Sequence, residues 1–149
     1  MAAAKSYEEL EVWNKAHGLV LEVYRLSRAF PREEVYGLTS QLRRAAASVA
    51  ANIVEGFRRP TKADKARFYQ VALASLDETH YHLRLAHDLG YADTQTTRAG
   101  YDEAGRMLNA YTQAVVASDR SRRDFRTYGL ITAMIGGMAY VVSLLASRF

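Results

Sequence analysis

The sequence contains no cysteine, and only two of its 149 residues are prolines. Without cysteine the chain forms no disulfide framework and offers no thiolate ligand to a metal. Because proline interrupts helices, having only Pro31 and Pro60 favours long helical segments. The first ten residues contain no apolar stretch of signal-peptide length. These absences favour a helical protein of the cytoplasm.

The basic excess is concentrated near the C-terminus. Residues 1–118 hold 15 Lys and Arg against 14 Asp and Glu, whereas residues 119–149 hold five Arg and two Asp. Bulk charge therefore does not mark residues 1–118 as a nucleic-acid binder, although the whole chain carries a net charge of +4. A chain of this length fits one domain with a real core. We expect a domain over 1–118 and an extension over 119–149.

Helical spacing of apolar residues begins near the N-terminus. Ser6 followed by Glu9 matches a capping box, which predicts that the first helix begins there. The segment Phe30-Pro31 ends it, because the residue before a proline avoids helical geometry. The steps of three and four residues place its apolar side chains on one face. That stripe is Val12, Trp13, Ala16, Leu19, Val20, Val23 and Leu26.

A second helix is expected from about Leu38 to Phe57, after a connection over residues 32–37. Small residues let neighbouring backbones approach closely, so its alanines predict the most buried of the helices. Its apolar stripe is Leu38, Leu42, Ala46, Val49, Ile53 and Phe57.

Two further helices follow Pro60. Thr61 with Asp64 predicts the N-terminal cap of the third, and Gly90 suits the left-handed residue that ends it, with Tyr91 packing back on its last turn. Asp93, Thr94 and Thr96 are candidate caps for the fourth, in which Gly105 predicts a close helix contact. The stripes are Phe68, Ala72, Leu76, Thr79, Leu83 and Ala86, then Tyr101, Ala104, Leu108, Tyr111 and Val115.

Four amphipathic helices with mostly short connections predict an all-α, antiparallel up-down-up-down four-helix bundle. The extension adds an apolar helix or tail. A basic stretch containing Arg120, Arg122, Arg123 and Arg126 precedes residues 128–147, which carry no charge. That span is long enough to cross a membrane, with the bundle left in the cytoplasm. The alternative is a fifth helix that packs on the bundle or on a neighbouring subunit, and Gly136-Gly137 weakens the membrane interpretation.

Several ordered motifs resemble a known family. They are Tyr7-Glu8-Glu9-Leu10-Glu11-Val12-Trp13, Phe30-Pro31-Arg32-Glu33-Glu34, Tyr36-Gly37-Leu38-Thr39-Ser40-Gln41-Leu42-Arg43-Arg44-Ala45-Ala46, Ser48-Val49-Ala50-Ala51-Asn52-Ile53-Val54-Glu55-Gly56 and Leu89-Gly90-Tyr91. Together they resemble the bacterial four-helix bundle proteins encoded in intervening sequences of 23S ribosomal RNA genes. The resemblance covers roughly residues 5–118. Ala50 stands where the family commonly has a proline, and the extension from about Asp119 has no counterpart.

The resemblance implies a fold more than a chemistry. It implies no enzymatic activity and no cofactor, and it implies a ring-forming homo-oligomer, expected to be a pentamer. A distant relative is the accessory variability protein of diversity-generating retroelements, which binds a reverse transcriptase and nucleic acid. By analogy of fold, this relation favours an RNA-linked role.

Basic residues are dense at the junction of the second and third helices, where Asp64 is the only opposing charge, and Arg43 and Arg44 lie about four turns earlier on the second helix. Phosphate contacts from such a patch would give salt-sensitive binding without sequence specificity. The alternative is a solvated junction with local ion pairs, which is common on protein surfaces. The candidate nucleic-acid-binding residues are Arg43, Arg44, Arg58, Arg59, Lys62, Lys65 and Arg67.

The remaining polar residues favour structure over catalysis. A di-iron bundle needs two Glu-x-x-His elements, and the chain has none, so we interpret His80 and His87 as interfacial or partly buried histidines and expect no metal. Asn52 and Glu55 lie near the core by helical phase, which predicts a network of Glu55 with Arg43, Arg44 or a tyrosine. Ser48 and Ser75 lack the strand-turn-helix setting of a catalytic serine.

Three functions follow. The first is a non-enzymatic homo-oligomeric scaffold, with an RNA association. The second is a nucleic-acid-binding accessory protein that uses the basic junction for RNA or DNA. The third is a tail-anchored membrane protein with a cytosolic bundle.

Overall fold

The computed structural model describes residues 4–118, and the tail segment 128–147 lies outside them. The chain divides into two compact units, Met1–Val115 and Val116–Phe149, and all but three of the described residues belong to the first. Within the described residues there are four α-helices and no strand. They are α1 (Glu11–Leu26), α2 (Leu38–Arg58), α3 (Lys62–Asp88) and a fourth helix over residues 95–118.

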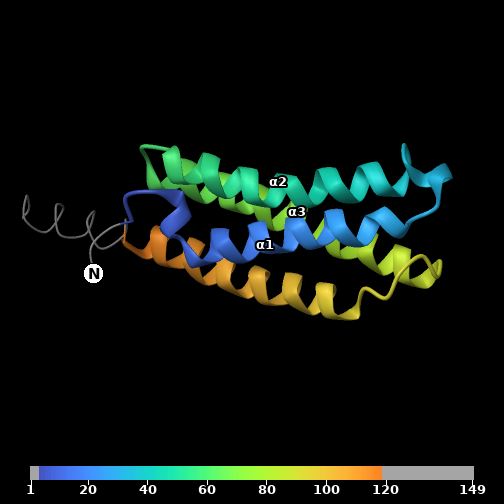
Figure 1. Cartoon of the computed structure of the whole chain (residues 1–149). Coiled ribbons are helices and arrows are strands. Elements are labelled where there is room, and N and C mark those ends of the chain that lie inside the picture. Colours follow the sequence, from blue (N-terminus) through green and yellow to red (C-terminus); the bar gives the residue numbers. More distant parts are fainter. Residues whose placement is uncertain (1–3, 119–149) are drawn as a thin grey trace, which may run out of the picture. The chain divides into compact units, whose positions relative to one another are not determined.

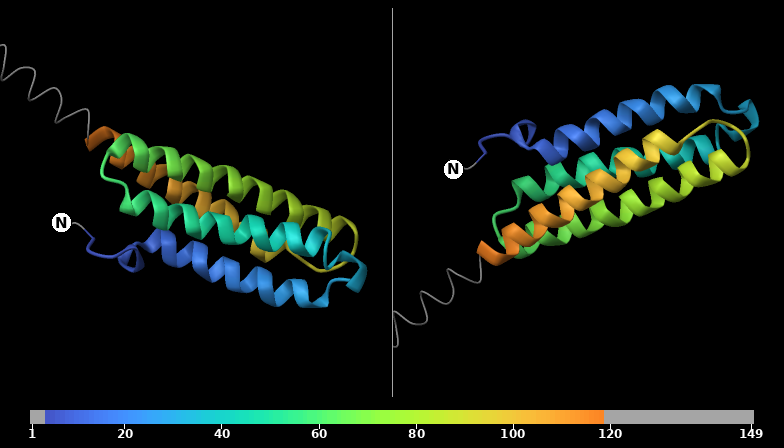
Figure 2. Two further views of the ribbon diagram at one scale, coloured as in Figure 1. Left: turned by 90° about the horizontal axis from the view of Figure 1, so that it is seen from above. Right: turned by 90° about the horizontal axis from the view of Figure 1, so that it is seen from below.

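The helices run alternately up and down, so each is antiparallel to its neighbours in the chain (Figure 1). The two views of Figure 2 place α2 between α1 and α3, with the fourth helix beside both of these. The predicted all-α four-helix bundle is confirmed. Within residues 4–118 no helix combines the length and the apolarity that a membrane span requires.

The first helix begins later than the capping box predicts. Ser6 caps a 3-10 turn, Tyr7–Glu9, by accepting a hydrogen bond from the Glu8 amide at 3.3 Å. The Glu9 carboxylate accepts from the amide of Lys5 instead of that of Ser6. Leu10 is extended and 8% exposed, so it enters the core and α1 starts only after it. The predicted start at Ser6 is therefore wrong by one turn.

The connection between α1 and α2 is held by one carboxylate. Phe30 is extended before Pro31, as predicted, and a 3-10 turn, Arg32–Glu34, follows. The Glu34 carboxylate accepts from the Leu38 amide at 2.8 Å and from the Tyr91 hydroxyl at 3.1 Å. One side chain thus caps the start of α2, where Gly37 offers no cap, and joins it to the loop after α3.

Eight of the 21 residues of α2 are buried, against seven of 27 in α3 and five of 16 in α1. This agrees with the expectation that small side chains make the second helix the most buried. At Gly56 an added Cβ would lie 2.5 Å from the buried ring of Tyr69, so the two helices touch closely there. Phe57, at the end of the predicted stripe, is only half-buried.

The predicted ends of α3 are present. Thr61 Oγ1 accepts from the Asp64 amide at 3.1 Å at its start. Gly90 has φ +71° at its end, and the Tyr91 amide donates to the Ala86 carbonyl at 2.9 Å. This bond from the second residue after the cap is the Schellman pattern.

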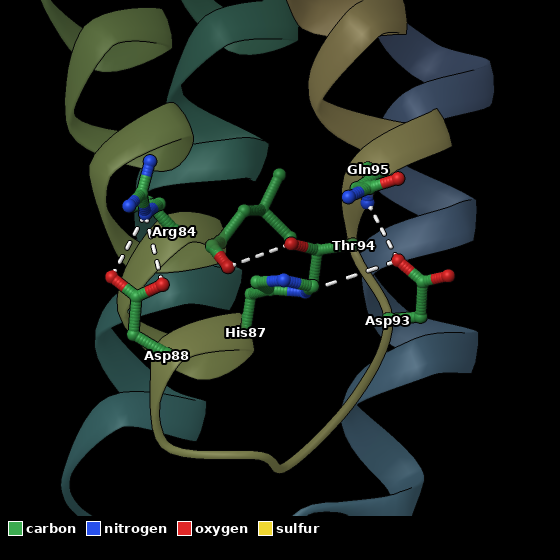
Figure 3. Close-up of polar contacts among 7 residues, drawn as sticks. Arg84, His87, Asp88, Asp93, Thr94 and Gln95 are labelled. Atoms are coloured by element: carbon green, nitrogen blue, oxygen red, sulfur yellow. Dashed lines mark hydrogen bonds and ion pairs between the residues drawn. The ribbon is translucent and has the colours of Figure 1, made fainter.

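The fourth helix begins after Asp93 and Thr94. The Asp93 carboxylate accepts from the Gln95 amide at 3.1 Å, and the Thr94 hydroxyl donates to the Leu83 carbonyl at 2.8 Å (Figure 3). Thr94 therefore ties the new helix to α3, while Asp93 caps it. At Gly105 an added Cβ would lie 3.4 Å from Leu76 Cδ2, which agrees with the close contact predicted there.

Candidate functional site

The candidate nucleic-acid interface lies where α2 ends and α3 begins. Arg59 is extended ahead of Pro60, and Thr61 then caps α3, so the chain reverses within three residues. This sharp reversal places the basic residues of both helix ends at one end of the bundle. The structure divides the seven candidate residues into those that already bind other parts of the bundle and those that are exposed.

Lys65 is directed back onto the end of α2. Its ammonium group donates to the carbonyl oxygens of Gly56 and Phe57, and its Nζ lies 5.4 Å from the centroid of the Phe57 ring. Burial lowers the pKa of Lys65 below its ordinary value. A cation at a helix C-terminus satisfies carbonyl groups that have no helical partner. Lys65 is therefore committed to capping α2.

Arg59 is likewise held within the junction. It forms an ion pair with Glu55, one turn earlier on α2, and its guanidinium lies 4.5 Å above the centroid of the Phe68 ring. Glu55 thus pairs with Arg59, and the predicted network with Arg43, Arg44 or a tyrosine is wrong. Residues four apart on a helix are neighbours on its surface, which explains the local choice.

Arg43 does not join the junction. It lies 15 residues before Arg58, which is about 22 Å along a helix. Its Nε donates to Ser27 Oγ at 2.8 Å, and its guanidinium lies 5.0 Å from the centroid of the Tyr24 ring. Arg43 therefore links α2 to the end of α1.

Arg44, Arg58 and Arg67 are exposed, and none of them has an ion pair with another residue of the range 4–118. Arg58 and Arg67 lie near the junction, together with the half-buried Lys62. Arg44 is more than three turns away along α2. The available cationic surface at the junction is thus smaller than the seven residues predict.

Three of the four histidines each lie near a single carboxylate. His80 Nε2 is 3.5 Å from Asp102 Oδ1 on the fourth helix, and His87 Nδ1 is 3.9 Å from Asp93 Oδ1 (Figure 3). His82 Nε2 is 3.6 Å from Glu78 Oε1 on its own helix. Over residues 4–118, no group of three potential ligands from His, Asp and Glu is arranged to hold a metal ion.

A small polar cluster joins α2 to α3. Ser48 Oγ and Ser75 Oγ are 2.8 Å apart, and Asn52 Nδ2 donates to Ser48 O at 2.8 Å and to Ser48 Oγ at 3.0 Å. The hydroxyls of the two serines thus form a hydrogen bond with each other across the interface of α2 and α3. Sequence reasoning considered each serine separately, because nothing in the chain order says that residues 27 positions apart will meet.

Two tyrosines lie wholly inside the bundle. Tyr69 is 0% and Tyr101 is 1% exposed, and neither hydroxyl has a hydrogen-bond partner within the described residues. Burial raises the pKa of both phenols above the ordinary value, and the carboxylate of Glu22 adds to this for Tyr101. The ring of Tyr111 lies 5.3 Å from that of Tyr69. These rings fill the core, which is the use we expected for Tyr101 and Tyr111.

A cavity of about 400 Å³ opens between the start of α1 and the fourth helix. Its lining is mainly apolar, with two carboxylates at the edge. The lining residues are Glu9, Leu10, Glu11, Val12, Met107 and Tyr111. Glu9 and Glu11 are the acidic residues of this lining, and the Glu9 carboxylate already accepts a hydrogen bond from the Lys5 amide.

Large apolar side chains are exposed on two helices. On α1, Leu21 is 59% and Tyr24 is 44% exposed, and on α3, Tyr81 is 61% and Val71 is 45% exposed. Tyr36, in the connection before α2, is 95% exposed. Sequence reasoning did not identify these positions, because Leu21 and Tyr24 lie just beside the predicted stripe.

Known proteins agree with this fold. The family model described as 23S rRNA-intervening sequence protein matches residues 8–110. The chain is also similar to a crystal structure of a protein with unknown function from the S23 ribosomal protein family of Bacteroides thetaiotaomicron. The TM-score is 0.64 at 22% sequence identity, over 68% of this chain and 95% of the other. At this identity the likeness shows the fold alone. No curated protein matches the sequence.

Proposed function

The chain belongs to the 23S rRNA-intervening sequence protein family, and we propose that it acts as a non-enzymatic scaffold assembled from copies of itself. The observation that supports this proposal is the apolar surface that a single bundle leaves uncovered. Leu21 and Tyr24 are 59% and 44% exposed on the outer side of α1. Contiguous exposed apolar surface is typical of protein–protein contacts.

The neighbouring side of α2 extends this surface. Arg43 of α2 contacts Tyr24 of α1. Because α1 and α2 are antiparallel, Leu21, one turn before Tyr24, lies level with Ala47, one turn after Arg43. Ala51 and Val54 continue the outward side of α2. We name the surface formed by Leu21, Tyr24, Ala47, Ala51 and Val54 the α1–α2 face. Its small side chains allow a second helix to approach closely.

The proposed assembly is a closed ring in the cytoplasm, and the family resemblance favours five subunits. The polar groups of the described residues fit a scaffold, since many of them are bonded to one another, as in the pairs Ser48 with Ser75 and Glu55 with Arg59. Such pairs join helices or hold their ends, and their polar groups do not gather at one site. No cofactor forms part of the proposal.

Light scattering on the purified full chain tests the scaffold. We expect a mass of several subunits at micromolar concentration and a monomer mass for Leu21→Glu, because a charged carboxylate would replace an apolar contact of the α1–α2 face and would lose hydration on assembly. Leu89→Glu is the matched control, since Leu89 is 49% exposed at the end of α3, away from this face. A wild-type chain that is strictly monomeric at this concentration would refute the scaffold.

Nucleic-acid binding at the α2–α3 junction is the second candidate. It is supported by Arg58 and Arg67, which are exposed and form no ion pair within residues 4–118. Arg58→Glu with Arg67→Glu is expected to abolish retention on structured RNA at low salt, as is the pair Arg58→Glu with Arg59→Glu. Arg84→Glu serves as the control, because Arg84 is exposed but paired with Asp88 at the far end of α3. Equal retention of both double variants and the parent would place the RNA site elsewhere.

The third candidate, a membrane anchor, depends on residues 128–147, which carry no charge in the sequence. Membrane fractionation tests it by comparing the full chain with a truncation after Ser118. The full chain should sediment with membranes and the truncation should not. If both stay in the supernatant, residues 128–147 are not an anchor.

A further inference from the structure

The α3 helix presents a second exposed surface, which is acidic in its middle. Val71, Ala74, Glu78 and Tyr81 follow one another at steps of three and four residues, so they lie on one side of the helix. All four are exposed, with Tyr81 at 61% and Val71 at 45%. We name these four residues the α3 face. Asp77 is exposed beside it, so its middle carries two carboxylates, of which that of Glu78 lies 3.6 Å from His82 Nε2, while Arg67 is exposed one turn before Val71 at its end.

The α1–α2 face is bordered by cations. Arg28, Arg44 and Arg58 are exposed around it, and none of the three has an ion pair with another described residue. No acidic residue belongs to this face. Glu55 is paired with Arg59, and the Glu22 carboxylate accepts a hydrogen bond at 2.8 Å from the hydroxyl of Thr97 on the fourth helix. One exposed apolar surface of the bundle is therefore basic at its border, and the other is acidic in its middle.

We propose that the α3 face of one copy docks on the α1–α2 face of the next copy, through apolar contact bordered by ion pairs. This inference rests on the proposed self-association and adds which surfaces meet. Two copies that joined through the same α1–α2 face would bring the basic border of one copy, with Arg28, Arg44 and Arg58, against the basic border of the other. Like charges facing each other across an interface oppose binding and select the other pairing.

The positions of the two faces allow every copy to use both at once. The α1–α2 face lies on α1 and α2, whereas the α3 face lies on α3, which Figure 2 shows on the far side of α2 from α1. A contact between unlike surfaces is heterologous, and it continues from copy to copy until a rotation closes it into a ring. The charge pattern thus selects a head-to-tail assembly over a two-fold dimer.

Mixing two variants of the full chain tests this pairing. Leu21→Glu blocks the α1–α2 face and leaves the α3 face intact, whereas Tyr81→Lys blocks only the α3 face and adds a cation that the basic border repels. Each variant alone should be monomeric by light scattering. An equal mixture should form a one-to-one dimer, visible by native mass spectrometry, because one intact contact remains between the two different chains.

Two further variants and a circular-dichroism measurement distinguish a loss of docking from a loss of folding. Tyr81→Phe keeps the apolar ring and should assemble as the wild type does. Glu78→Lys is a second block of the α3 face and should raise the dissociation constant at least about tenfold. Both blocking variants should keep the helical circular-dichroism spectrum of the wild type, since each replaces an exposed side chain.

The outcomes are distinguishable. If the wild type assembles and Tyr81→Lys and Glu78→Lys assemble equally well, the α3 face takes no part and the inference is wrong, while the scaffold stands. If both single variants are monomeric but their mixture stays monomeric, the two faces do not pair with each other. A monomeric wild type overturns both the scaffold and this inference.

Discussion

Single residues show how closely the helices of this bundle approach one another. Gly56 leaves room for the ring of Tyr69, with an added Cβ only 2.5 Å from Tyr69 Cε1. Gly18, in the middle of α1, has no atom within 4 Å of the same added Cβ. The same residue type therefore has a packing role at one position and none at the other.

We predict opposite effects when these two glycines are replaced by alanine. Gly56→Ala should lower the free energy of unfolding by about 1–3 kcal/mol, because the buried ring of Tyr69 must move to admit the methyl group. Gly18→Ala should raise it by about 0.5–1 kcal/mol, because alanine is the better helix former in open space. Urea denaturation of each variant measures both. Equal stability of Gly56→Ala and the wild type would contradict the close contact.

The buried Tyr101 predicts a loss of stability at high pH. The unfolded chain releases the Tyr101 proton near the ordinary pKa of 10.0, whereas burial and Glu22 raise the pKa of this phenol in the folded state. Above pH 10 the folded chain binds more protons than the unfolded chain, so the free energy of unfolding falls as the pH rises. Tyr101→Phe should make this fall smaller, and it should leave stability at pH 7 little changed, because the hydroxyl has no hydrogen-bond partner within residues 4–118.

Urea denaturation at pH 7 and pH 10.5 measures the difference for Tyr101→Phe. Tyr36→Phe is the control, because Tyr36 is 95% exposed and its removal should not alter the dependence on pH. The same alkaline loss in the wild type and in Tyr101→Phe would assign the effect to other groups, Tyr69 first among them.

At the scale of the helices, the ends are determined by short-range bonds of different kinds. A threonine hydroxyl caps α3, a carboxylate four residues upstream caps α2, and Lys65 caps the end of α2 from the following helix. The first was predicted from the sequence because the cap and its amide are three residues apart. The other two were not predicted, because Glu34 and Lys65 match no standard capping motif.

Thr61→Ala should destabilise the protein by about 1 kcal/mol, since the Asp64 amide loses its acceptor at the start of α3. Thermal unfolding should show a lower midpoint for this variant than for the wild type. Thr96→Ala is the matched control, because Thr96 is exposed on the fourth helix and should change the midpoint little. A midpoint shift no larger than that of the control would show that the cap contributes nothing.

At the scale of the whole molecule, the bundle of residues 4–118 leaves two apolar surfaces uncovered, one with a basic border and one with an acidic middle. If copies cover these surfaces, folding and assembly are linked by mass action. Apolar surface that is buried only in the assembly stabilises the folded chain in proportion to the population of assembled copies.

The midpoint of thermal unfolding should therefore rise with the concentration of the wild-type chain. For Leu21→Glu it should be independent of concentration, because this variant cannot bury the α1–α2 face. Scanning calorimetry over a hundredfold range of concentration measures the shift. A concentration-independent midpoint for the wild type would argue against assembly in this range.

The sequence by itself determined the helices, since the spacing of apolar residues and caps such as Thr61 and Gly90 depends only on neighbours in the chain. Its two prolines also mark the connections between the first three helices, and its motifs resemble those of the family. The start of α1 was predicted too early because Leu10 is drawn into the core. The sequence did not reveal that Arg59 pairs with Glu55 and that Lys65 caps α2, so both were predicted as available to nucleic acid.

Only the tertiary structure decided which side chains of different helices meet. Ser48 with Ser75, Glu34 with Tyr91 and Arg43 with Tyr24 are pairs set by the rotation and register of the helices. Those two quantities follow from packing all the stripes together, and no local pattern in the chain records them. For the same reason, the exposure of Leu21 and Tyr81, on which the proposed assembly depends, became visible only in the folded bundle.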